Sequence, residues 1–98
     1  MALPVFLDSQ PLFHPGIVVT TPGVMEKISD MELSLALSRH LQGDWGDVSL
    51  KDQKDNDAAL FLHGRIISAY CTKGDSVKFW IITEADRSST TVLLPDEY

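Results

Sequence analysis

The chain is short of cysteine, of basic residues and of long apolar runs. It has one cysteine among 98 residues, Cys71, which excludes an internal disulfide and is typical of a reducing compartment. No apolar run approaches the roughly 20 residues of a membrane-spanning helix. The first residues are apolar without the basic start of a signal peptide. We therefore expect a cytoplasmic protein that has no membrane as a partner.

Basic residues are outnumbered by acidic ones. Eight Lys and Arg against 14 Asp and Glu give a net charge of −6. Direct nucleic-acid binding is not expected, because phosphate contacts need clustered basic side chains. Five aspartates lie between residues 44 and 57, and of these Asp52, Asp55 and Asp57 could imitate DNA phosphates. A solvated helix face, interrupted by Lys51 and Lys54, is the alternative.

Motifs that demand one chemistry are also missing. The three histidines, His14, His40 and His63, lack metal-ligand spacing, and there is no nucleophile elbow, phosphate-binding loop or dinucleotide fingerprint. We expect no metal and no cofactor. Whether the protein is an enzyme is left open, with a non-enzymatic role favoured.

What is present is the composition of one globular domain, 44% apolar and 22% charged. Residues 1–16 hold Pro4, Pro11 and Pro15, which predict an extended arm, since proline removes backbone donors. Residues 17–98 are expected to form a single α+β domain. Ile17 to Thr20 is β-branched throughout, which favours a short strand.

Capping signals predict two or three short helices. Thr21 before Pro22 opens a short helix over 22 to about 28. Ser29 and Glu32 form a capping-box pattern for a second helix that Gly43 would end. A third helix is expected from Ser49 or Asp52 to about Leu62. Its expected apolar side is Leu50, Ala58, Phe61 and Leu62, and Gly64 would end it.

The last third of the chain changes period and predicts a three-stranded antiparallel meander over 65–72, 77–84 and 89–94. A tight Gly74-Asp75 turn would pair residues whose numbers sum to 149. That register places Arg65 opposite Glu84, and a base facing an acid is a favourable cross-strand pair.

Both faces of this meander are apolar. One carries Ile66, Tyr70, Phe79, Ile81, Val92 and Leu94, and the other carries Ile67, Ala69, Trp80, Ile82 and Leu93. Helices can cover one face. The other must meet the N-terminal arm, a second copy in a homodimer, or a protein partner.

Several polar residues near helix ends and turns are candidates for a site. His40 could be a general base oriented by Asp44, or could complement the helix dipole. Glu84 and Asp86 could do acid–base or metal chemistry, or could form a turn held by ion pairs. Trp45 could anchor a partner or fill the core. The remaining binding candidates are Arg65, Tyr70, Trp80 and Arg87.

Four motifs carry a resemblance. Thr-Pro-Gly at 21–23, Arg-His-x-x-Gly-Asp-Trp-Gly-Asp at 39–47, Arg-x-x-Ser-x-Tyr at 65–70 and the run from Trp80 to Tyr98 resemble a family of small bacterial proteins commonly labelled as plasmid-related. The resemblance covers about residues 17 to 98 and implies a bacterial cytoplasmic setting on mobile elements, with no established activity. Besides the candidates above, the matching residues are Arg39 and Thr91.

Three functions are therefore considered. The first is an accessory protein that acts by protein–protein binding, in one version as an inhibitor of a host defence nuclease. The second is a small enzyme or ligand-binding protein that uses His40, Asp44, Arg65, Glu84, Asp86 and Arg87 at the sheet rim. The third is a purely structural polar network, in which alanine at Arg65 or Glu84 would lower thermal stability sharply.

Overall fold

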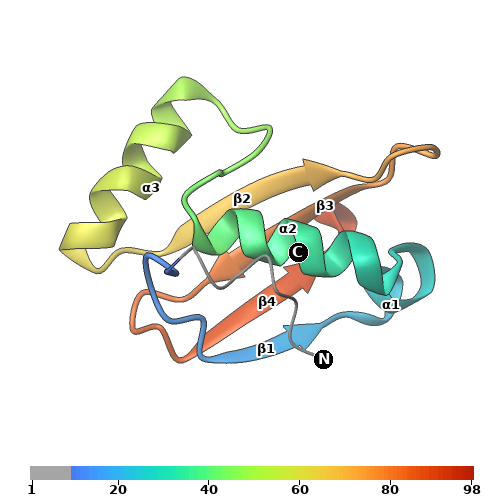
Figure 1. Ribbon diagram of the computed structural model, residues 1–98, viewed down its shortest axis with the longest axis horizontal. Coiled ribbons are helices and arrows are strands. Elements are labelled where there is room, and N and C mark those ends of the chain that lie inside the picture. The colour runs from blue at the N-terminus through green and yellow to red at the C-terminus, as the bar shows by residue number, and fades with distance from the viewer. Residues whose placement is uncertain (1–9) are drawn as a thin grey trace.

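The computed structural model describes residues 10–98 and shows a mixed α+β architecture, with three helices and one four-stranded open sheet (Figure 1). No helix in this range is long and apolar enough to cross a membrane. The elements in chain order are β1 (Ile17–Thr20), α1 (Pro22–Lys27), α2 (Asp30–Leu41), α3 (Leu50–Leu62), β2 (Ile66–Cys71), β3 (Lys78–Thr83), β4 (Ser89–Leu93) and a 3-10 turn (Pro95–Glu97).

Each helix begins at a side-chain cap. The hydroxyls of Thr21, Ser29 and Ser49 accept backbone N–H groups of α1, α2 and α3, so that Ser49, rather than Asp52, begins the third helix. The end of α3 differs from the expectation. The left-handed residue after the helix is His63, with a φ of 56°, and not Gly64.

The sheet order is β1-β4-β3-β2, with β2, β3 and β4 antiparallel and β1 parallel to β4. Tyr70 pairs with Phe79 and Ala69 with Trp80, so the predicted register is confirmed. The prediction of a tight two-residue turn at Gly74-Asp75 is wrong. The ladder closes where Thr72 N–H donates to Val77 O, and Lys73 N–H donates to a Glu32 carboxylate oxygen instead. Residues 73–76 therefore form a four-residue loop, which leaves the register unchanged.

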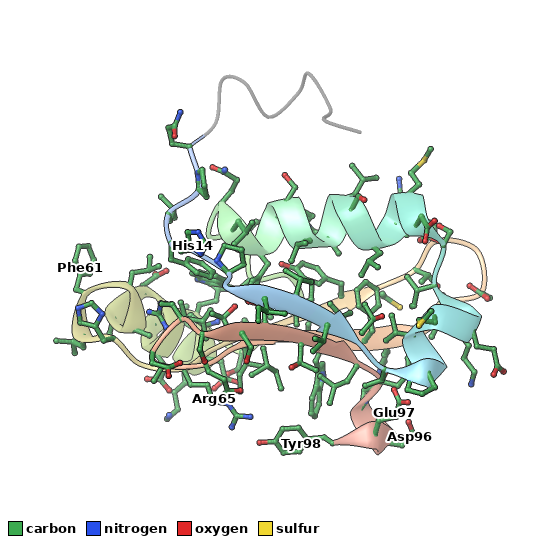
Figure 2. The ribbon with its side chains drawn as sticks, turned by 90° about the horizontal axis from the view of Figure 1, so that it is seen from below. His14, Phe61, Arg65, Asp96, Glu97 and Tyr98 are labelled. Carbon is green, nitrogen blue, oxygen red and sulfur yellow. The ribbon has the colours of Figure 1, made fainter. Side chains whose placement is uncertain are left out.

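The two faces of the sheet are covered differently. The helix-covered face packs under α2, and its core consists of Val24, Ile28, Ala36, Tyr70, Phe79, Ile81, Val92 and Leu94. On the opposite face, Ile82 and Leu93 are buried and Trp80 is half-buried. Tyr98 packs edge-on against Trp80, with ring centroids 5.7 Å apart, and lies below the sheet in Figure 2. The C-terminal residues, then, cover part of that face.

The described part of the N-terminal arm lies on the helix side. Leu12 N–H donates to Leu41 O at 2.8 Å, and the Phe13 ring lies 5.3 Å from His40. Residues 10–16 thus do not cover the second face. The arm expected over residues 1–9 lies outside the described residues.

α3 stands beside the sheet, next to the edge of β2 (Figure 1). Its predicted apolar side is wrong: Leu50, Ala58, Phe61 and Leu62 are exposed, and Phe61 points away from the protein in Figure 2. The buried residues of α3 are Asn56 and Ala59. The reason is geometric. A helix that docks side-on to a strand edge meets backbone polar groups, and an amide side chain satisfies these better than an apolar one.

Candidate functional site

A buried chain of polar side chains crosses the sheet under α2. His40 is fully buried, with Nδ1 2.6 Å from the Ser68 hydroxyl and Nε2 2.9 Å from the Thr83 hydroxyl. Thr83 Oγ1 lies 2.7 Å from Thr90 Oγ1, and the Thr90 hydroxyl donates to Pro15 O at 2.7 Å. The chain thus links β2, β3 and β4 to the arm before β1.

The hydrogen bond from Thr90 to Pro15 O fixes the direction of every other hydrogen bond in this chain of side chains. Because the single proton of the Thr90 hydroxyl goes to Pro15 O, Thr90 must accept from Thr83. Thr83 has then used its proton and accepts from His40 Nε2–H. That leaves Nδ1 of the neutral ring as the acceptor for Ser68. His40 is therefore held as one tautomer, with all its polar atoms satisfied.

A serine hydroxyl that donates to a histidine nitrogen is the geometry of a nucleophile and its base. Here no acyl group can reach it, because Ser68 and His40 are both fully buried. The other ring nitrogen faces a threonine hydroxyl and not an orienting carboxylate. Burial, together with the positive charge of Arg87, lowers the pKa of His40 to about 3. The ring stays neutral and works as a structural junction.

Asp44, the expected partner of His40, binds Arg39 instead. Arg39 Nε is 2.7 Å and its terminal nitrogen 3.2 Å from the two Asp44 oxygens. This pairing holds the pKa of Asp44 below its usual range. The Arg39 guanidinium also lies 4.7 Å from the centroid of the Tyr70 ring, and the Tyr70 hydroxyl donates to Asp44 O. These contacts fasten the end of α2 to β2.

Trp45 is buried against Phe13 and His40, and its indole N–H donates to Asp57 at 2.9 Å. Gly46, which follows, has a φ of 74°. A Cβ at Gly46 would collide with the Ala69 carbonyl, so only glycine lets the loop approach β2 this closely. Trp45 and Asp57 thereby join the loop to α3.

The turn after β3 also contacts the end of α3. The Arg87 guanidinium donates to the carbonyls of Gly64 at 2.6 Å and Ala59 at 2.9 Å, which are at the end of the helix. Within the turn Asp86 accepts Ser88 N–H, and hydrogen bonds from the Ser88 side chain and backbone lower the pKa of the Asp86 carboxyl. Glu84 faces Arg65 across the strands at 3.7 Å, and both are partly exposed. Arg65 also donates to the Tyr98 hydroxyl.

The candidate residues therefore do not converge on one pocket. His40 reaches β3 only at Thr83, while the Glu84 and Asp86 carboxylates form contacts of their own. Among residues 10–98, no group of three or more His, Cys, Asp or Glu side chains could hold a metal ion.

Sequence reasoning missed the partners that matter most: Ser68, Thr83, Thr90 and Asn56. A signal for the hydroxyls was present. All three share the inward positions of their strands with apolar residues, where an unpaired hydroxyl would be costly. Nothing in the sequence singled out Asn56, since an asparagine among helix aspartates looks like surface.

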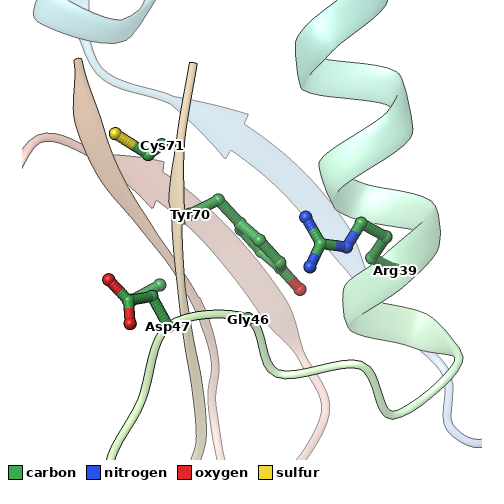
Figure 3. A pocket seen from close by; sticks show the side chains of 6 residues that line it. Arg39, Gly46, Asp47, Tyr70 and Cys71 are labelled. Atoms are coloured by element: carbon green, nitrogen blue, oxygen red, sulfur yellow. The ribbon is translucent and has the colours of Figure 1, made fainter. Parts of the chain in front are cut away.

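A hollow of the described surface lies between α2 and the outer edge of β2. We call it the rim groove. Two adjoining cavities of about 480 and 380 Å³ form it, and they share Arg39, Tyr70 and Cys71. The larger is mainly apolar, with Met31, Leu35, Ala36 and Phe79 in its walls. Figure 3 shows the smaller one, with Arg39 from α2, Tyr70 and Cys71 from β2, and Asp47 from the loop.

One wall of the groove is strand backbone. Along β2, Ala69 N–H donates to Trp45 O and Asp47 N–H donates to Ala69 O, so odd-numbered residues face outward. Cys71 is the next of these, and no hydrogen bond from the described residues occupies its outward backbone groups. The rim groove thus combines apolar side chains with a free donor and acceptor.

The chain was also compared with models of known protein families, with curated proteins and with solved structures, and none of the three comparisons gave a match.

Proposed function

We propose that the protein acts by protein–protein binding, and that the rim groove receives a short extended segment of its partner. The observation that carries the proposal is the groove itself: a mainly apolar cavity of about 480 Å³ beside an unpaired strand position. Concave apolar sites with a few polar groups are the usual form of a binding site.

The groove matches an extended segment in two ways. Backbone groups of the segment would pair with Cys71, which continues the pairing that residues 45–47 make with Ala69. Its apolar side chains would lie between Leu35 of α2 and Phe79 of the sheet. Met31 and Leu35 are exposed on the rim and would become covered.

The acidic stretch favours this surface over imitation of DNA. Asp57 accepts the Trp45 indole, and Asp55 pairs with Lys51 at 2.8 Å. These carboxylates are occupied within the fold or neutralised beside it. Inhibition of a host defence nuclease would then depend on binding at the rim groove rather than on a row of carboxylates. The resemblance to plasmid-related proteins would place the partner in a bacterial cytoplasm.

A comparative capture tests the proposal. Tagged wild-type protein and three variants are incubated with bacterial lysate, and the captured proteins are quantified. Met31→Glu with Leu35→Glu should lose the partner, because two carboxylates would line the apolar wall. Phe61→Glu, at an exposed apolar site on α3, is the matched control and should keep it, as should Asp52→Lys with Asp55→Lys. A capture profile that is unchanged in the groove variant would overturn the proposal.

A further inference from the structure

At the opposite edge of the sheet, no described residue pairs with the outward backbone groups of β1. Ile17 N–H donates to Ser88 O, and Thr21 N–H donates to Val92 O, so odd-numbered residues face β4. The backbone N–H and C=O groups of Val18 and Thr20 consequently point outward. Figure 1 shows β1 at the sheet's margin, and no other described element lies beyond it.

The side chains of this edge are apolar and exposed. Ile17, Val18 and Val19 have 71%, 40% and 44% of their surface accessible. No charged residue occurs from Pro15 to Met25, in a chain whose net charge is −6. Natural proteins usually protect an edge with a lysine, a bulge, a proline within the strand or a covering element. β1 is short, at four residues, but among residues 10–98 it has none of these other protections, although the same sheet covers its other edge at Ile67 and Ala69.

We propose that β1 pairs with β1 of a second copy of this chain, antiparallel and about a two-fold axis at Val19. Val18 of each copy would then face Thr20 of the other, and each such pair exchanges two backbone hydrogen bonds. The odd-numbered pairs place Val19 opposite Val19 and Ile17 opposite Thr21. Every outward group of Val18 and Thr20 finds a partner in this register.

Charge and length both favour a second copy over another partner. Two chains of charge −6 repel each other least where they meet through an uncharged segment. Pro15 and Pro22 flank the strand and stop the pairing from extending, so the contact suits one short strand of the same length. The pair would form one continuous eight-stranded sheet, with the two rim grooves at its far ends.

This inference does not rest on the proposed function, and its test involves no partner protein. Light scattering on a sizing column, over micromolar to millimolar protein, should give twice the protomer mass. Val18→Lys should give the protomer mass, because two lysines would enter the neutral contact. Phe61→Lys, at an exposed apolar site on α3, should remain dimeric. A wild-type protein that is monomeric throughout, or a dimer that Val18→Lys leaves intact, would overturn the proposal.

Cysteine cross-linking tests the register separately, in a Cys71→Ser background. In a non-hydrogen-bonded antiparallel pair the Cα atoms are about 4.5 Å apart, within the range of about 4.4–6.8 Å that a disulfide accepts. Val19→Cys should therefore form a disulfide-linked dimer under mild oxidation. Val18→Cys and Thr20→Cys should not cross-link alone but should do so when mixed. Equal cross-linking at all three positions, or none at Val19→Cys, would contradict the two-fold register.

Discussion

The two edges of the sheet are treated in opposite ways. At the β2 edge, the Asn56 side chain replaces a neighbouring strand: its amide donates to Ile67 O at 2.8 Å and its carbonyl accepts from Ile67 N–H at 3.1 Å. The Trp45–Asp47 loop then covers Ala69. At the β1 edge, no described element performs this role.

This difference shows where the sequence places its specific residues. Asn56, Gly46 and Trp45 all serve the β2 edge, whereas β1 carries only apolar or hydroxyl side chains. Covering an edge requires particular residues, and leaving one open requires none. Within residues 10–98 the fold covers one edge and leaves the other unpaired, and an unpaired edge is a template for pairing with another chain.

The largest expected effect comes from His40, because its hydrogen-bond chain connects β2 to the arm before β1. His40→Ala would leave the Ser68 hydroxyl without an acceptor, remove the donor that Thr83 accepts from and open a cavity. Together these should lower the free energy of unfolding by on the order of 4 kcal/mol. Urea denaturation measures this. His63→Ala removes an exposed histidine and should cost less than about 0.5 kcal/mol. Similar losses of unfolding free energy in His40→Ala and His63→Ala would refute the role of His40 as a structural junction.

The same residue predicts a pH dependence. The unfolded chain binds a proton on His40 near pH 6.5, while the folded chain does so only near about 3. Between these values the unfolded state holds more protons, so the free energy of unfolding falls as pH falls, by about 1.4 kcal/mol per pH unit. Denaturation between about pH 6 and pH 5 should show this slope. His40→Gln should flatten it, and an unchanged slope in that variant would show that another group is responsible.

An intermediate effect is expected at the covered edge. Asn56→Asp would set a carboxylate oxygen against Ile67 O in place of a donor, and should lower stability by roughly 2 kcal/mol. Hydrogen exchange should show the loss of protection first at Ile67 N–H and along α3. Gln53→Ala, on the exposed side of the same helix, is the control. Equal stability of the two variants would mean that the amide does not hold the edge.

The smallest effect is expected at Arg65 and Glu84, which flank the paired ends of β2 and β3. Their side chains are 41% and 43% exposed and 3.7 Å apart, so solvent screens the pair. Glu84→Gln should change stability by less than about 1 kcal/mol. A sharp fall in the melting temperature of Glu84→Gln would instead support the structural polar network that the sequence predicted there.

Local rules made much of this fold predictable. Thr21, Ser29 and Ser49 act within one helical turn, and the pleat fixed the pairing of Tyr70 with Phe79 even though the turn was wrong. The position of β1 was not predictable, because its parallel pairing with β4 joins opposite ends of the chain. Tertiary contact also decided which side of α3 is buried.

The candidate site was predicted only in part, and for a similar reason. His40 stood out, but its neighbour in sequence, Asp44, turned toward Arg39, while its actual partners came from three strands. Hydroxyls at inward strand positions give a better signal than proximity along the chain. The rim groove left no trace in the sequence, since its walls meet only after folding.

The way α3 is fastened decides how large an assembly can become. Pairing at one edge alone closes after two copies, whereas a molecule with two open edges can add copies without end. In the proposed pair, α3 would stop growth at the β2 edge, and it is held there by the Asn56 amide, the Arg87 guanidinium, the Trp45 indole and a small apolar cluster around Ala59. A brief local opening of this helix would turn a closed pair into the growing end of a fibre.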